Sequence, residues 1–296
     1  MIHILGAGAI GSLYAHYLNI AKIPVTILSR LPQQLVSTRI SVNGSHSESL
    51  IGNDTSCIST LLVCTKAYDT IPAIERLGPR IKDATIILLQ NGVLDVYSDL
   101  LDMKSLDYRS IILGSTTHGV IRTHPQQVSH VGIGNTVIGK LDKCSHADNQ
   151  LLSLLSGAWA PLNTTITHGD KLREVLLLKL AINACINPLV AVLGCPNGAL
   201  LEGHGRDLIK PLALEIESVF PELADHNIFE NVQQVLENTK RNRNSMEQDV
   251  EKGRMTEIES ITGYLLKEGA KRGLKLPYNE WLYLLIKQKC RKKICT

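Results

Sequence analysis

A lysine and two asparagines are the residues of the second half of the chain whose types and spacing best suit chemistry. Lys179, Asn183 and Asn187 follow one another at intervals of four, and the side chains between them are all Leu, Ala, Ile or Cys. Residues four apart lie on one face of a helix. A helix that is apolar around most of its girth is buried, so this polar stripe should face something other than hydrocarbon.

The stripe predicts a helix face that lines a cleft. A lysine that is partly removed from water has its pKa lowered towards neutrality, which suits a proton donor. The alternative is that the asparagines bond only backbone groups and that Lys179 extends to solvent. The helical period covers Val175 to Ile186. Pro188 disfavours helical geometry at Asn187, so we expect the helix to end or kink there.

Other polar candidates follow along the chain: Asn197 on an expected turn, "CPNGAL", and Ser245 with Asp249, four residues apart. Glu257 is a further candidate, but it has an ordinary explanation. Thr256 and Glu259 fit a capping box, and an acid in the first turn suits the helix dipole.

The opening "MIHILGAGAIGSLYAHYL" contains Gly6, Gly8 and Gly11 in the pattern G-x-G-x-x-G. The pattern lies after an expected strand and before an amphipathic helix that covers Ser12 to Ile20. In that context the glycines permit a tight turn and a close backbone approach to a pyrophosphate at the helix N-terminus. We therefore predict dinucleotide binding, against the alternative of a simple glycine bend.

The second expected strand, "PVTILSR", indicates which dinucleotide is bound. An NAD enzyme usually ends this strand with an acid that holds the ribose 2′-hydroxyl, whereas here it ends with Ser29 and Arg30. A guanidinium can pair with a 2′-phosphate. The sequence thus predicts NADP (NADPH), unless Arg30 is an uninvolved surface residue.

The first half of the chain alternates short β-branched runs with helical stretches, which is typical of βαβ units and a parallel sheet. The expected strands are "IHILGAG", "PVTILSR", "TLLVCTKA", "TIILLQNG" and "SIILGSTTH", and "VSHVGIGNTVIGK" is expected to form a pair of short antiparallel strands. After about Thr167 the chain is helical in period. We predict an α/β fold: a Rossmann-type dinucleotide-binding domain over residues 1–167 and an all-helical substrate domain over residues 168–296.

The composition limits the possible function classes. Hydrophobic residues make up 44% of the 296 residues and charged residues 20%, which excludes global disorder, and a net charge of +3 gives no case for a nucleic-acid partner. Seven scattered cysteines without metal-ligand spacing indicate reduced thiols and no metal site. We see no signal peptide and no apolar run of about 18 residues. A cytoplasmic protein without a membrane partner is expected, either a monomer or a homodimer.

Over essentially its whole length the sequence resembles the ketopantoate reductases, enzymes of pantothenate and coenzyme A biosynthesis. The resemblance is carried by "GAGAIGSLYA", "LLVCTKAYDT", "ILLQNGV", "LGSTTHGV", "KLAINACINPLVAVLGCPNGAL" and "MTEIESITGYL". The last two blocks are the most specific. The segment "LEGHGRDLIKPLALEI" matches only loosely.

This resemblance implies a role for each candidate residue. Lys179 would be the general acid and Glu257 the acceptor for the substrate hydroxyl. The substrate would be bound by Asn91, Asn183, Asn187, Asn197 and Ser245. NADPH would be held by Gly6, Ala7, Gly8, Ala9, Ile10, Gly11, Arg30, Lys66, Asn91, Gly119 and Glu257.

These residue types suit the reduction of ketopantoate, a small molecule with a carboxylate, a ketone at C2 and a hydroxyl at C4. The alkoxide that forms at C2 needs a proton and positive charge, which Lys179 supplies. Three rival functions remain: a reductase of another branched 2-oxo acid on the same scaffold, a non-catalytic NADPH-sensing protein, and an interaction module without a ligand.

Overall fold

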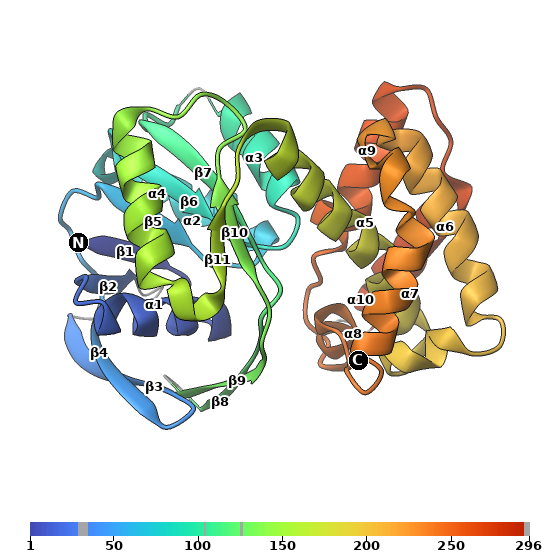
Figure 1. Ribbon diagram of the computed structural model, residues 1–296, viewed down its shortest axis with the longest axis horizontal. Coiled ribbons are helices and arrows are strands. Elements are labelled where there is room, and N and C mark those ends of the chain that lie inside the picture. The colour runs from blue at the N-terminus through green and yellow to red at the C-terminus, as the bar shows by residue number, and fades with distance from the viewer. Residues whose placement is uncertain (29–34, 104, 125–126, 293–296) are drawn as a thin grey trace. The chain divides into compact units, whose positions relative to one another are not determined.

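The computed structural model describes residues 1–28, 35–103, 105–124 and 127–292. The chain divides into two compact units, Met1–Arg173 and Glu174–Thr296. Figure 1 shows strands and helices in the first unit and helices throughout the second. The predicted α/β class, with a sheet domain followed by a helical domain, is confirmed.

Within the described residues, the first unit holds an 11-stranded sheet in the order β11-β10-β7-β6-β5-β1-β2-β4-β3-β9-β8. The strands are β1 Ile2–Leu5, β2 Val25–Leu28, β3 Val36–Val42, β4 Ser45–Gly52, β5 Thr60–Val63, β6 Thr85–Leu88, β7 Ser110–Thr116, β8 Gly119–His124, β9 Gln127–Gly132, β10 Thr136–Gly139 and β11 Thr164–Ile166. Neighbouring strands from β7 through β6, β5, β1 and β2 to β4 are parallel. The five apolar runs of the sequence supply five of these six strands.

The segment expected to form an antiparallel pair does contain two strands, β9 and β10, but they do not pair with each other. β9 pairs with β8, and β10 pairs with β7. The chain from β7 to β8 and the chain from β9 to β10 form one long antiparallel ribbon, interrupted near Thr117. At the interruption Thr117 N–H donates to Asn135 O at 2.9 Å, so the second arm lies along the preceding segment instead of folding back on itself.

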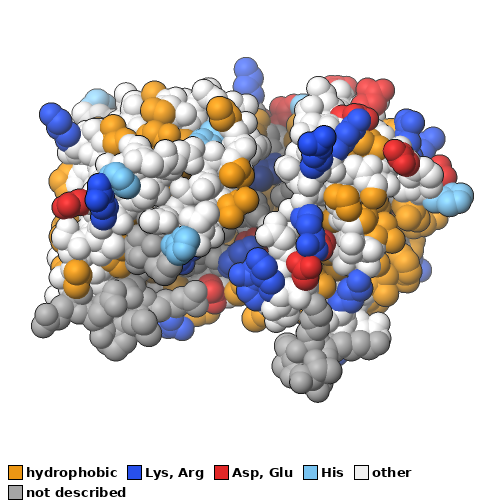
Figure 2. Space-filling view, turned by 90° about the horizontal axis from the view of Figure 1, so that it is seen from below, with side chains coloured by type: hydrophobic (Ala, Val, Ile, Leu, Met, Phe, Trp, Pro, Cys, Tyr) orange, Lys and Arg blue, Asp and Glu red, His pale blue; other side chains and the backbone are white. Residues whose placement is uncertain are grey.

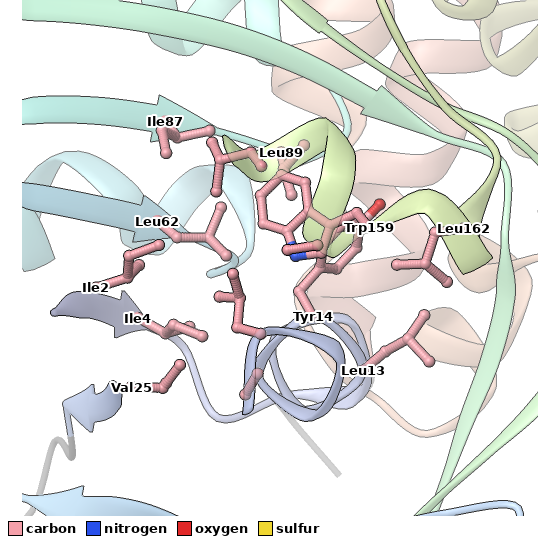
Figure 3. Close-up of a cluster of buried hydrophobic side chains, with 14 of the residues drawn as sticks. Ile2, Ile4, Leu13, Tyr14, Val25, Leu62, Ile87, Leu89, Trp159 and Leu162 are labelled. Carbon is pink, nitrogen blue, oxygen red and sulfur yellow. The ribbon is translucent and has the colours of Figure 1, made fainter. Parts of the chain in front are cut away.

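The helices of the first unit are α1 Ala9–Ile20, α2 Ala67–Glu75, α3 Val93–Asp102 and α4 His146–Ala158, with single 3-10 turns η1 Gly78–Ile81 and η2 Ala160–Leu162. Helix α1 packs against α4, and α2 packs against α3 (Figure 1). Figure 3 shows the cluster in which α1 meets the sheet. There Tyr14 and Trp159 contact edge to face, with ring centroids 4.7 Å apart. The Tyr14 hydroxyl bonds Thr136 Oγ1 at 2.6 Å, which fixes the helix that follows the glycine turn.

As far as residue 292, where the description ends, the second unit comprises the rest of a long helix and five shorter ones. They are α5 Gly169–Leu193, which begins in the first unit, α6 Gly205–Val219, α7 Ile228–Asn238, α8 Ser245–Glu251, α9 Tyr264–Lys271 and α10 Pro277–Lys292, with 3-10 turns η3 Asn197–Leu201 and η4 Pro221–His226 and a π-helical turn η5 Glu259–Gly263. Lys and Arg side chains are interspersed with Asp and Glu over the face seen in Figure 2. A group of apolar side chains also lies on the helical unit in that view.

We expected the long helix to end or kink at Asn187. It does not end there, because α5 continues through Pro188 to Leu193. Pro188 has no N–H to donate, but its neighbours Leu189 and Val190 are buried. Lys289 of α10 donates to the carbonyls of Ala191 and Val192 at 3.2 and 2.5 Å. Packing and this cap outweigh one lost hydrogen bond.

Helix α5 is also long and apolar enough to cross a membrane, by length and composition. In the structure, 67% of its most apolar window is buried. Core helices of globular proteins pass the same test, so α5 is accounted for as the central helix of its unit.

A buried ion pair fixes α4 to the end of β10. Lys140 Nζ donates to Asp148 Oδ2 at 3.1 Å, and both side chains are buried. Burial would raise the pKa of the Asp148 carboxyl, but hydrogen bonds from Ser145, Ser110 and Lys140 outweigh it and lower the pKa to about 2.

We expect Asp148→Asn to lower the free energy of unfolding by about 3 kcal/mol at neutral pH. The substitution removes the buried carboxylate and leaves the buried Lys140 ammonium with Ser110 Oγ at 3.1 Å and the exposed Asp142 carboxylate at 3.6 Å. The wild-type advantage should be complete above about pH 4 and should be lost as the pH falls through 2, where Asp148 takes up a proton. Urea unfolding at several pH values measures both effects.

Asp142→Asn is the matched control, because Asp142 also lies near Lys140, at 3.6 Å, but is 69% exposed. Its effect should stay below about 0.5 kcal/mol. Equal losses in the two variants would contradict the role of burial.

Candidate active site

The glycine turn connects β1 to α1 and has no room for a side chain at Gly6 or Gly11. Gly6 has φ +114°, and a Cβ on Gly11 would lie 2.0 Å from the Gly6 carbonyl oxygen. A Cβ on Gly8, by contrast, meets nothing within 4 Å. Ala7, Ala9 and Ile10 pack against the core cluster, so the turn is held rigidly and faces open space at Gly8.

This geometry suits a phosphate. Gly8 is the N-cap of α1 and supplies no side-chain cap, and the first turn of the helix contains no acid. Its first N–H groups and the positive end of the helix dipole are therefore available to an anion. The turn fits the pyrophosphate of a dinucleotide.

Two further candidates follow strands that lie beside β1 in the sheet. Lys66 comes after β5 and is the N-cap of α2, and Asn91 comes after β6, just before α3. β1, β5 and β6 are parallel neighbours, so Lys66 and Asn91 lie at the same edge of the sheet as the glycine turn. Ligands of open α/β sheets bind at this edge.

Gly119 lies at the start of β8, directly opposite Gly132 of β9. A Cβ on Gly119 would lie 3.2 Å from the Gly132 nitrogen, so the two strands approach closely there.

Arg30, the residue on which the predicted preference for NADP depends, lies outside the described residues.

In the helical unit, Lys179 and Asn183 are partly buried and Asn187 is buried on α5, which places the whole polar stripe on one continuous helix. Burial lowers the pKa of the Lys179 ammonium to about 8, and the nearby Glu257 carboxylate opposes this change. The lysine and the glutamate are thus electrostatically coupled, although 78 residues separate them in the sequence.

Glu257 is only 6% exposed and precedes the π-helical turn η5. The capping box that would have explained it does not form. Thr256 Oγ1 is buried without a partner among the described residues. The Glu259 carboxylate instead accepts hydrogen bonds from Tyr283 and Lys287 of α10. Single π-helical turns occur frequently at functional sites.

Asn197 begins η3 and is also 6% exposed. Its backbone N–H donates to Asn242 O at 3.0 Å, and its side-chain Nδ2 donates to Thr239 Oγ1 at 2.9 Å. Ser245, the first residue of α8, is exposed next to this turn. No sequence motif indicates Thr239 and Asn242, because only the fold brings them to Asn197.

The remaining candidate of this segment, Asp249, is buried and pairs with Arg254 at 3.2 Å. Within the described ranges, no three His, Cys, Asp or Glu side chains come together as a metal site. The first unit thus offers a sheet edge that suits an anion. In the second unit Lys179 and Glu257 are coupled, with Asn183 and Asn187 on the same helix as the lysine, and Asn197 is held separately by Thr239 and Asn242.

A parallel sheet with a glycine turn, followed by a helical unit, is an architecture found among two-domain α/β oxidoreductases that bind a dinucleotide. Residues 2–143 match the family described as Ketopantoate reductase PanE/ApbA, and residues 171–290 match its C-terminal domain. The chain belongs to the ketopantoate reductase family, a family of oxidoreductases.

Individual relatives agree with this assignment. The chain is 31% identical to a 2-dehydropantoate 2-reductase of Vibrio cholerae, over 97% of this chain and 96% of the relative. It is also 31% identical to the solved structure of Bacillus subtilis panE, described as a probable 2-dehydropantoate 2-reductase, with a TM-score of 0.78 and coverage of 97% and 99%. A D-mandelate dehydrogenase solved with NADH and anilino(oxo)acetate shares the fold at 22% identity, with a TM-score of 0.81 and 99% of each chain covered.

We expect Gly11→Ala to destabilise the protein by about 2 kcal/mol or more, because its Cβ would meet the Gly6 carbonyl. The midpoint of thermal unfolding should fall by several degrees. Gly8→Ala is the matched control in the same turn, and its Cβ would point into open space. Equal midpoints for the two variants would contradict the close approach of α1 to Gly6.

Proposed function

We propose that this chain reduces 2-dehydropantoate (ketopantoate) to (R)-pantoate with NADPH, as a step of pantothenate and coenzyme A biosynthesis in the cytoplasm. The observation that carries the proposal is the partly buried Lys179, whose pKa is lowered to about 8 by burial while Glu257 opposes the change. The names of the relatives and the open space beside Gly8 at the N-terminus of α1 support it. The free cysteines of the described residues suit a reducing compartment.

The dinucleotide supplies the hydride that reaches C2 of the substrate. Backbone N–H groups at Gly8 and at the start of α1 would hold its pyrophosphate. Lys66 and Arg30 would bind the adenosine phosphate, and Asn91 would lie towards the nicotinamide. Gly119 would contact the cofactor through its backbone.

The residues of the helical unit act on the substrate. As the C2 carbonyl becomes an alkoxide, the Lys179 ammonium gives it a proton, which completes the hydroxyl and leaves a neutral amine. Glu257 accepts the hydrogen bond of the C4 hydroxyl. Ser245 and the side-chain amides of Asn183, Asn187 and Asn197 bind the rest of the substrate.

A steady-state assay of NADPH oxidation tests the proposal. Purified protein should oxidise NADPH with ketopantoate and should use NADH at least about 100-fold less efficiently in kcat/KM. 2-Oxo-3-methylbutyrate, which lacks the hydroxyl, should be a much poorer substrate. No oxidation with ketopantoate would overturn the proposal.

The second candidate function is reduction of another 2-oxo acid, and the shared fold of the D-mandelate dehydrogenase favours keeping it. Phenylglyoxylate, the aryl 2-oxo acid that corresponds to mandelate, belongs in the same assay. A higher kcat/KM for phenylglyoxylate or 2-oxo-3-methylbutyrate than for ketopantoate would select this alternative. Binding of NADPH without turnover of any acid would indicate a sensing protein.

The pH profile should identify the proton donor. Because Lys179 must be protonated to act, kcat/KM for reduction should be constant below about pH 8 and fall tenfold per pH unit above it. Lys179→Ala should lose at least about 100-fold in kcat and the alkaline limb with it. Lys171→Ala, an exposed lysine of the same helix, is the control. An unchanged alkaline limb in Lys179→Ala would assign the proton to another group.

Glu257→Gln should shift that limb to lower pH. The Glu257 charge raises the pKa of Lys179, so a neutral amide of the same shape lets burial lower it further. The variant should also lose at least about tenfold in kcat/KM for ketopantoate, since a hydrogen bond to a charged group is lost. A limb that stays in place would mean that the two groups are not coupled during turnover.

A further inference from the structure

The side-chain amide of Asn197 is held by the hydroxyl of Thr239. Asn197 Nδ2 donates to Thr239 Oγ1 at 2.9 Å, and the same hydroxyl donates to the Val235 carbonyl at 2.6 Å. That carbonyl also accepts the backbone N–H of Thr239 at 3.0 Å. The Thr239 side chain is therefore fixed at the end of α7 and holds the amide that contacts it.

The backbone around Asn197 is fixed by the same segment. Asn197 N–H donates to Asn242 O and Gly198 N–H donates to Lys240 O, both at 3.0 Å. A Cβ on Gly198 would lie 2.8 Å from that Lys240 oxygen, so only glycine allows this approach. The turn that joins α7 to α8 thus holds both the main chain and the side chain of Asn197.

The orientation carries a cost. Asn197 Oδ1 is buried, and no described residue donates a hydrogen bond to it. An unpaired buried acceptor is destabilising and rare in native proteins. The hydrogen bond to Thr239 thus leaves one polar atom of the Asn197 amide for a partner outside the described residues. An amide that the protein holds at one atom and leaves open at the other suits a binding group fixed in advance of its ligand.

We propose that Thr239 is a positioning residue for substrate recognition: its hydroxyl holds the Asn197 amide in the orientation in which that amide binds the 2-oxo acid. The inference rests on the proposed function and on the assignment of Asn197 to the substrate. It adds a residue that does not itself touch the substrate and that no sequence motif indicated.

The test compares Thr239→Val, which keeps the shape but removes the hydroxyl, with Thr239→Ser, which keeps the hydroxyl. With Thr239→Val, KM for ketopantoate should rise about fivefold, the value of one hydrogen bond. Its kcat and its KM for NADPH should stay within about twofold, because the proton donor and the dinucleotide site are unchanged. Thr239→Ser should restore the wild-type KM. Ser218→Ala is the matched control, since this exposed hydroxyl also donates to a helix carbonyl, that of Glu215 at 2.6 Å.

A double-mutant cycle shows whether Thr239 acts through Asn197. In an Asn197→Ala background, Thr239→Val should leave KM within about twofold, because the amide that it orients is absent. A full fivefold effect in that background would overturn the inference. So would an unchanged KM in Thr239→Val, or a raised KM that Thr239→Ser does not restore.

The activity of the wild-type protein distinguishes a failure of the proposed function from a failure of the positioning role of Thr239. Wild-type protein that does not reduce ketopantoate overturns the proposed function and this inference with it. Wild-type protein that is active, with Thr239→Val unfolding at a lower temperature but with an unchanged KM, overturns the positioning role alone.

Discussion

The removal of the Lys179 ammonium from water is the constraint on which the helical unit depends. Burying an unpaired charge is strongly unfavourable. The structure places Glu257 near enough to oppose the effect of burial, and the pKa of Lys179 settles near 8. At that value the lysine is mostly charged at neutral pH yet can release its proton easily. Full solvation would keep the proton too firmly bound, and complete isolation would leave the lysine neutral.

Several contacts that stabilise this unit also fix the polar groups around that lysine. The end of α5 is capped by Lys289 of α10, and α10 also supplies Tyr283 and Lys287 to the Glu259 carboxylate beside Glu257. α5 and the start of η5 are therefore both tied to one C-terminal helix. Mutations in α10 can thus affect the site without touching substrate.

Local patterns were enough to predict the central strands, α1, the glycine turn and the polar stripe, because each depends on the order of neighbouring residues. Local patterns failed where contacts between residues far apart in the sequence determine the structure. The helix continues through Pro188 because its neighbours there are buried. β9 and β10 pair with β8 and β7, which together form a longer ladder than a hairpin between β9 and β10 would. The β3–β4 hairpin was missed. Thr239 could not be predicted for the same reason, since it is 42 residues from Asn197 in the sequence and only the fold brings the two side chains into contact.

The two units therefore differ in how far a sequence motif can predict the groups that they offer to a ligand. The first presents backbone N–H groups, whose placement requires only that Gly11 lack a Cβ and that Gly8 face open space. A motif of three glycines encodes that, and it is compatible with many reactions. The second presents an ammonium, a carboxylate and amides from separate elements, and each has properties set by its burial and its neighbours. Chains that share this fold at low identity can therefore share the first arrangement while differing in the second. If the proposed function holds, substrate choice is to be sought in the surroundings of Lys179, Glu257 and Asn197. The hydrogen bond from Asn197 to Thr239 then makes a residue that does not touch the substrate part of those surroundings.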